Sequence, residues 1–228
     1  MADFLPTSID IGELRERWGA FAFTADNDRQ AKTIIGRYPP GRQQSAIIPL
    51  LDLAQRQVGA KTGTQGWLPI PVIEYVAAYL GMPYIRAYEV ATFYTMFNLR
   101  PVGRFHVQVC GTTPCMLRGS DDVFAACKAK GMTKGATTPD GLFTLSEVEC
   151  LGACANAPMA QINDDNYEDL TFESMTAILE ALARGETPRP GPQVERQASA
   201  PEGGVTTLPE MVTENHDYRP RWNEGRRA

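Results

Sequence analysis

The chain has 228 residues, a formal net charge of −5 and 43% hydrophobic residues. This acidic balance argues against a general nucleic-acid binder. The sequence has no run of about 18 apolar residues, which argues against a membrane-spanning protein. The length suffices for one or two domains with a buried core.

The first half of the chain is expected to be helical. Residues 1–23 show little periodicity and are interpreted as a lead-in segment. Thr24 and Ser45 offer oxygens that can cap two helices, and Pro71 suits the first turn of a third. With a fourth helix, these segments form a predicted helical bundle over residues 24–98. The four predicted helices span residues 24–37, 45–57, 71–80 and 86–97.

The sequence pattern changes after this bundle. Residues 105–109 alternate as a strand, residues 121–130 are typical of a helix, and residues 142–148 predict a second strand. A strand, a helix and a strand in succession form a right-handed crossover with parallel strands. The predicted domain covers residues 99–187. It is completed by a hairpin of residues 159–162 and 167–170 and by a final helix at 172–183.

Four of the five cysteines form two tight pairs at the ends of these strands. Cys110 and Cys115 make a C-x4-C motif, and Cys150 and Cys154 make a C-x3-C motif. Because parallel strands end at the same edge of a sheet, the crossover brings the two pairs together. Four thiolates among small residues are typical of an iron–sulfur cluster, while zinc and structural disulfides are alternatives. Zinc sites more often use C-x2-C pairs, often with histidine, and neither histidine lies inside a pair.

These motifs resemble the thioredoxin-like [2Fe–2S] ferredoxin family. The resemblance rests on VCGTTPC at 109–115 and VECLGACANAP at 148–158, and it covers roughly residues 20–187. GWL at 66–68 and EVATFYTMF at 89–97 are similar to one branch, the NuoE-type peripheral-arm subunits of respiratory complex I. The resemblance implies an α+β or α/β fold, with a helical bundle followed by a thioredoxin-like [2Fe–2S] domain. The ligands that it implies for one [2Fe–2S] cluster are Cys110, Cys115, Cys150 and Cys154.

The resemblance also implies a function. It implies an electron-transfer subunit of an NADH:quinone oxidoreductase, which lies beside the flavin- and NADH-binding subunit and other peripheral-arm subunits and is not a stand-alone catalyst. Alternatives are the homologous subunit of an NAD-linked hydrogenase or formate dehydrogenase, and a zinc-stabilised structural module. A thiol–disulfide redox protein is disfavoured, because such proteins use a C-x-x-C motif.

The N-terminus bears on the compartment. It lacks the basic and apolar regions of a signal peptide, and it is not the arginine-rich, acid-poor stretch of a transit peptide. We therefore expect a complex on the cytoplasmic side of a bacterial inner membrane, or on the matrix side for a mature organellar protein.

Other conspicuous residues have structural interpretations. Cys127 lies beside apolar residues at helical spacing and is interpreted as a small buried hydrophobe. His106 alternates on the first strand and is interpreted as structural. Phe93, Tyr94 and Phe97 form an aromatic face for core or subunit packing. Neither G-x-G-x-x-G nor a Walker motif occurs, so nothing indicates that this chain binds NADH or flavin itself.

Two acidic residues precede the second cysteine pair. Glu147 and Glu149 are expected to lower the reduction potential of a cluster if they point toward it, because a nearby negative charge disfavours an added electron. In the alternative interpretation, at least one of them is a solvated charge at the strand end.

After Gly185 the composition shifts to proline and glycine. Residues 188–228 are interpreted as a linker and an irregular C-terminal tail. All four predicted ligands precede this segment, so residues 186–228 are expected to be dispensable for the cluster. Tyr218 and Trp222 lie among arginines near the end, which fits either a disordered tail or a segment that folds onto a partner subunit.

Overall fold

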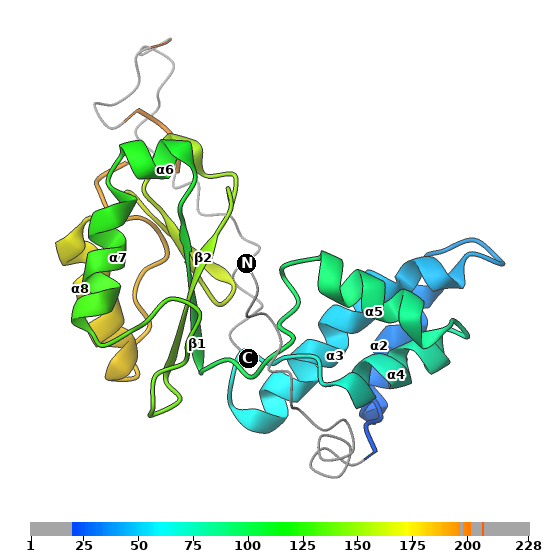
Figure 1. Ribbon diagram of the computed structural model, residues 1–228. Helices are drawn as coiled ribbons and strands as arrows, with labels where there is room; N and C mark the ends of the chain where they lie inside the picture. Colours follow the sequence, from blue (N-terminus) through cyan, green and yellow to red (C-terminus); the bar gives the residue numbers. More distant parts are fainter. Residues whose placement is uncertain (1–19, 197, 202–206, 208–228) are drawn as a thin grey trace. The chain divides into compact units, whose positions relative to one another are not determined.

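The computed structural model describes residues 20–196, 198–201 and 207 (Figure 1). Helices precede a mixed sheet that has helices packed on it, as the sequence predicts. In this part of the chain, no helix is both long and apolar enough to cross a membrane.

The chain divides into two compact units. The helical unit holds the described residues up to His106, together with Thr137–Thr144. The sheet unit holds Val107–Ala136 and the described residues from Leu145 onward. A compact unit need not be an independently folding domain, so the domain boundaries expected from the sequence stay predictions.

The helical unit closes around an aliphatic core. Thr24 caps α2 as predicted, because its hydroxyl accepts a hydrogen bond from the N–H of Asn27 at 3.3 Å. The Tyr79 hydroxyl of α4 donates to Asp28 Oδ1 of α2 at 2.6 Å and joins the two helices. The helices are α2 (Ala25–Ile35), α3 (Ile47–Thr62), α4 (Ile70–Tyr79) and α5 (Tyr84–Phe93). The largest fully buried side chains of this unit are Leu50, Leu51, Leu68, Ile73, Val58, Val72 and Val76.

Several helix bounds in this unit differ from the expectations, and α3 ends at Thr62, beyond the predicted residue 57. Ser45 caps no helix, because it lies in a 3-10 turn (Gln43–Ala46) and α3 begins only at Ile47. The fourth helix ends at Phe93, before the predicted residue 97, because Tyr94 adopts an extended backbone. The predicted lead-in segment includes Phe21 and Phe23, which pack on the core of this unit. Its residues 1–19 lie outside the described part of the chain.

The loop after α5 is held by a buried glutamine. Gln55 accepts a hydrogen bond from the N–H of Asn98 at 2.7 Å and donates one to the carbonyl of Met96 at 3.2 Å. The N–H of Leu68 also donates to the carbonyl of Asn98, at 2.8 Å. Gly66 lies so close to Gln55 that a Cβ would come within 2.1 Å of the Gln55 carbonyl oxygen, so only glycine fits. These hydrogen bonds therefore hold the motifs at 66–68 and 89–97 next to each other.

The sheet unit is built on five strands in the order β2-β1-β3-β4-β5. They are β1 (Phe105–Cys110), β2 (Phe143–Val148), β3 (Ala160–Ile162), β4 (Asp165–Glu168) and β5 (Gly191–Pro192). The N–H of Phe105 donates to the carbonyl of Leu142, and that of Gly111 to the carbonyl of Val148. Residue numbers therefore increase in the same direction along both strands, so β1 and β2 are parallel, as predicted. β3 is antiparallel to both β1 and β4.

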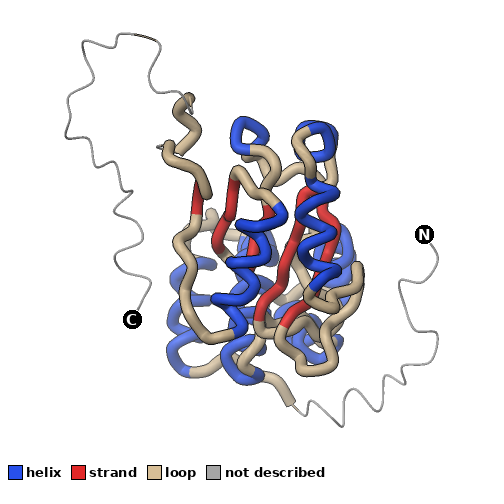
Figure 2. The backbone as a smooth tube through the Cα atoms, turned by 90° about the vertical axis from the view of Figure 1, so that its left-hand side faces the viewer, coloured by secondary structure: helices blue, strands red, loops and turns tan. Residues whose placement is uncertain are grey.

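Two helices cover one face of this sheet. α7 (Ser120–Ala129) and α8 (Phe172–Ala183) lie on the same side of β1 and β2 in Figure 1, and Figure 2 views them in front of the strands. Lys130 and Glu180 join them by a 2.5 Å ion pair. Cys127 on α7 has no exposed surface, and burial raises the pKa of its thiol to about 12, which agrees with a small buried hydrophobe. His106 on β1 is also buried, and burial lowers its pKa to about 4.

Three features of the sheet unit differ from the expectations. A short helix, α6 (Thr113–Leu117), was not predicted. The hairpin turn is shorter than residues 163–166, because β4 already begins at Asp165 and Asn163 adopts a left-handed backbone with φ of 56°. The C-terminal extension is not irregular throughout, because β5 pairs in parallel with β4. Tyr218, Trp222 and their neighbouring arginines lie outside the described residues.

Candidate functional site

The first cysteine pair lies at the inner side of the site. Cys110 is the last residue of β1, and Cys115 lies in α6, whose first turn contains Pro114. Each has 1% of its surface exposed, and they pack against Ala157 and Met159. The short helix α6 reverses the direction of the chain. Cys115 therefore faces the end of β1, where Cys110 lies.

The second pair lies at the outer side. Cys150 comes two residues after β2, and Cys154 begins a 3-10 turn (Cys154–Asn156); both thiols are exposed. Their sulfur atoms are 3.3 Å apart. The N–H of Gly152 donates to Cys150 Sγ at 3.4 Å, and Gly152 has a φ of +83°, a left-handed turn that glycine adopts without strain.

Local donors and burial set the ionisation of these thiols. Burial opposes ionisation of Cys110, but hydrogen bonds from Thr112, Cys115 and the Leu151 N–H outweigh it and lower the pKa. The N–H of Gly152 lowers the pKa of Cys150. Burial raises the pKa of Cys115 to about 11. In each pair, one thiol therefore has a lowered pKa and ionises more readily than the other: Cys110 in the first pair and Cys150 in the second.

The four thiols also act on one another. The Cys154 thiol donates a hydrogen bond to Cys150, which raises the pKa of Cys154, and the negative charge of Cys110 opposes the ionisation of both. The two pairs thus face one site, as the crossover predicts. Cys127 is not part of this group, because it is buried in α7.

The donor set fits a two-iron cluster. Thiolate sulfur is the donor that iron–sulfur clusters use, and each of two irons takes two protein ligands, which matches two cysteine pairs. Pairs of thiols with N–H groups aimed at two of the sulfurs fit such a core.

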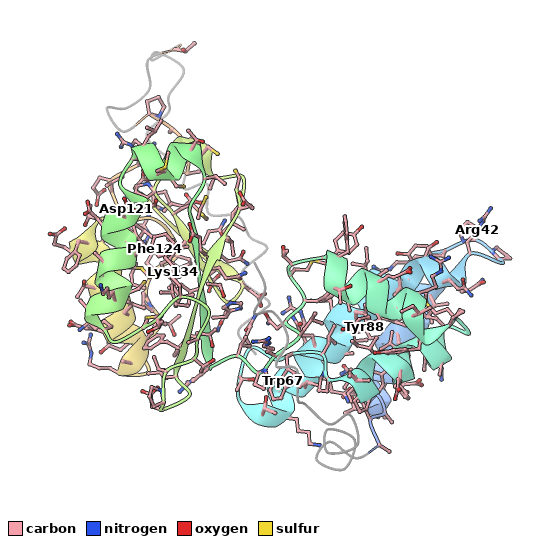
Figure 3. All side chains as sticks on the ribbon, in the orientation of Figure 1. Arg42, Trp67, Tyr88, Asp121, Phe124 and Lys134 are labelled. Atoms are coloured by element: carbon pink, nitrogen blue, oxygen red, sulfur yellow. The ribbon has the colours of Figure 1, made fainter. Side chains whose placement is uncertain are left out.

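The two acidic residues before the second pair lie differently. A Cβ built on Gly111 would come within 2.4 Å of Glu147 Oε1, so this carboxylate rests on the backbone beside Cys110. Glu147 Oε2 forms a 2.8 Å ion pair with Lys134, whose Nζ lies 3.7 Å from the ring centroid of Phe124 (Figure 3). Glu149 is exposed. Glu147 is thus the carboxylate placed to act on the site, and its charge is partly offset by Lys134.

Apolar side chains are exposed on both units. Of the predicted aromatic face, Phe97 is buried, whereas Phe93 is 77% and Tyr94 40% exposed. On α6, directly after Cys115, Met116 is 53% and Leu117 77% exposed. Exposed apolar side chains of this size are typical of surfaces that contact another protein.

Sequence reasoning missed α6 and the hydroxyl that supports the first pair. Thr112 precedes α6, and its Oγ1 lies 3.2 Å from Cys110 Sγ. A proline directly after two threonines is a recognised helix start, and it could have revealed this helix.

Comparisons with known proteins agree with this geometry. The model of the family "Thioredoxin-like [2Fe-2S] ferredoxin" matches residues 31–183. The chain is 61% identical over 163 residues to an NADH-quinone oxidoreductase subunit of Rickettsia conorii, and the match covers 71% of this chain and 94% of that protein. It is also 61% identical over 163 residues to the corresponding subunit of Rickettsia bellii, with the same coverage.

A solved structure shares the fold. An NAD+-reducing [NiFe]-hydrogenase in the air-oxidized state matches with a TM-score of 0.50 and 18% identity. The match covers 61% of this chain and 23% of the hydrogenase chain, so this chain spans about a quarter of that longer one. At this identity the likeness concerns the fold alone.

Proposed function

The chain belongs to the thioredoxin-like [2Fe–2S] ferredoxin family, and on that premise we propose that it is an electron-transfer subunit of an NADH-quinone oxidoreductase. The observation that carries the proposal is the set of four thiols, Cys110, Cys115, Cys150 and Cys154, which face one site as two pairs. These residues are its cluster ligands.

Each part of the site has a task. A bound [2Fe–2S] cluster supplies transfer of one electron at a time. Cys110 and Cys115 anchor it on the buried side, where Met159 and Ala157 exclude water. The N–H of Gly152 donates to a ligand sulfur and stabilises its negative charge. The exposed pair, Cys150 and Cys154, lies on the side from which a partner can approach.

The partner that we propose is the flavin- and NADH-binding subunit of the same complex. The exposed Met116 and Leu117 follow Cys115 directly, so a partner that covers them comes close to the ligands. The exposed Phe93 and Tyr94 offer a second apolar contact on the helical unit. In a bacterium, the complex places this chain on the cytoplasmic side of the inner membrane. The 61% identity to two quinone-oxidoreductase subunits favours this complex over a hydrogenase.

The proposal is tested by asking whether NADH reduces the cluster only when the flavin subunit is present. NADH is expected to reduce the cluster within the complex of this chain with the flavin subunit, and to leave the cluster of the isolated chain oxidised. The sequence has neither a G-x-G-x-x-G nor a Walker motif, so we expect the partner to supply the nucleotide site. Low-temperature electron paramagnetic resonance (EPR) before and after NADH addition measures this. Reduction of the isolated chain by NADH would contradict the proposed partner.

The Glu147–Lys134 ion pair predicts two opposite shifts of the reduction potential. Glu147→Gln is expected to raise it by about 40 mV and Lys134→Met to lower it by about the same amount. One charge at roughly 10 Å in a partly solvated setting changes the free energy of an added electron by about 1 kcal/mol. EPR-monitored redox titration gives both values. The double variant is the control, because it removes both charges and should return close to the wild-type potential. Unchanged potentials in both single variants would exclude this role.

A further inference from the structure

The chain returns to the sheet after its last helix. β5 pairs in parallel with β4, with Tyr167 opposite Gly191 and Glu168 opposite Pro192. The N–H of Gln193 then donates to the carbonyl of Glu168 at 2.9 Å. Residues 191–196 and 198–200, which we call the latch, therefore continue along β4 toward the loop that follows Cys154.

The latch carries one arginine whose head group is almost buried. Arg196 Nε lies 2.8 Å from Asp169 Oδ2, and its Nη2 also contacts Oδ1, so the pair is bidentate. Each of the two side chains is only 10% exposed. Arg196 Nη2 donates as well to the carbonyl of Ala155 at 3.1 Å. Ala155 is the residue directly after Cys154, so Arg196 touches the ligand loop itself.

Two further hydrogen bonds tie the next residue of that loop. Asn156 is buried, and its side-chain N–H donates to the carbonyl of Ala198 in the latch at 2.9 Å. The carbonyl of Asn156 accepts from the N–H of Asp169 at 2.8 Å. Asp169 and Ala198 both have a positive φ, of 54° and 47°, a backbone that residues other than glycine rarely adopt. Such backbones persist where the surrounding contacts hold them in place.

The ligand loop has little support of its own. Cys154 is exposed and sits in a 3-10 turn of three residues. The position of a ligand atom depends on the groups behind it, and losing such a group typically weakens metal binding by about 10- to 100-fold. A bidentate arginine–carboxylate pair that is shielded from water is directional, and it holds the guanidinium in one orientation.

We propose that the latch fixes the loop that carries Cys154, with Arg196 as the positioning residue, and that it thereby governs how firmly the chain retains its cluster. This inference rests on the proposed function, because it needs a cluster at the four thiols. For the latch, it also replaces the expectation that residues 186–228 are dispensable for the cluster. The latch itself provides no ligand, so its effect is on retention of the cluster rather than on cluster type.

The experiment compares cluster loss in the full-length chain. Wild type and Arg196→Ala, both purified with their cluster, are challenged with an iron chelator, and the decay of visible absorbance and the iron count are followed. Arg196→Ala is expected to lose its cluster about tenfold faster. Hydrogen exchange at residues 151–157 and the line shape of the reduced cluster in EPR should change in the same variant. A loss of overall stability alone would not confine the exchange to that loop or alter the line shape.

The matched control is a second arginine with the same bond pattern on the surface. Arg184 donates from Nε and Nη2 to the two carboxylate oxygens of Glu186 at 2.7 and 3.0 Å, but both side chains are more than half exposed. Arg184→Ala should lose its cluster at the wild-type rate. Arg196→Lys keeps the charge and can make only part of the contacts, so its rate should fall between those of wild type and Arg196→Ala.

The outcomes separate the latch from the proposed function. A wild-type chain that binds no iron would overturn the proposed function. A wild-type chain that holds its cluster, with Arg196→Ala and Arg184→Ala decaying equally slowly, would overturn the latch alone. If Arg196→Ala does not fold by circular dichroism, Arg196→Lys takes its place. A folded Arg196→Lys chain that decays at the wild-type rate would also overturn the latch.

Discussion

Replacing any one of Cys110, Cys115, Cys150 or Cys154 by alanine is expected to reduce bound iron from about two atoms per chain to almost none. A [2Fe–2S] core needs four protein ligands, and the structure brings no other cysteine to the site. Alanine is preferred to serine, because a serine oxygen can itself bind iron. Iron and acid-labile sulfide analysis of the purified variants measures the effect.

The control is the fifth cysteine. Cys127 is fully buried in α7, so Cys127→Ala should retain full iron and lose only about 1 kcal/mol of unfolding free energy. The assignment is wrong if Cys127→Ala loses its iron, or if any of the four site variants keeps the wild-type amount.

The second large effect is expected on the helical unit. Phe93→Glu should weaken binding of the flavin subunit at least 30-fold, because a buried aromatic anchor commonly contributes 2 kcal/mol or more to an interface. Phe93 is 77% exposed and stacks edge-to-face on Tyr94, with ring centroids 5.1 Å apart, so its removal leaves the core intact. The buried Gln55 forms hydrogen bonds to the loop that follows α5. This loop therefore carries Met96 on a fixed backbone. Calorimetric titration of the flavin subunit with the cluster-loaded chain gives the dissociation constant.

A matched substitution on the other unit serves as the control. Phe172 opens α8 and is 38% exposed, and a glutamate is tolerated at a helix N-terminus. Phe172→Glu should therefore bind the flavin subunit as wild type does. Equal binding by Phe93→Glu and wild type would remove the helical unit from the proposed interface. Iron content must stay at the wild-type level in both variants, since neither residue lies at the ligands.

The sequence allowed the position of the site to be predicted because two simple rules act together. Alternating residues identified β1 and β2, and the helix between them required a parallel crossover. Cys110 ends β1 and Cys150 comes two residues after β2, so the topology alone placed them at one edge. The last helix was predicted at its observed bounds from its amphipathic pattern, and in the structure Thr171 caps it.

The features that escaped prediction depend on contacts between distant residues. β5 is two residues long and consists of glycine and proline, which have low strand propensity, so only its pairing with β4 reveals it. The role of Arg196 depends on its contacts with Asp169 and Ala155, which are distant in the sequence. No local sequence pattern predicts these contacts. The residues of the predicted aromatic face do not share one surface, for a similar reason. Because α5 ends at Phe93, Phe97 is buried in the core while Phe93 is exposed.

The central claim is that four cysteines of this chain hold one [2Fe–2S] cluster. The most direct test is metal analysis of the purified full-length chain, combined with low-temperature EPR after reduction with dithionite. We predict about two irons per chain, negligible zinc, and one paramagnetic signal of a reduced [2Fe–2S] cluster. A colourless chain with one zinc ion and no such signal would contradict the claim.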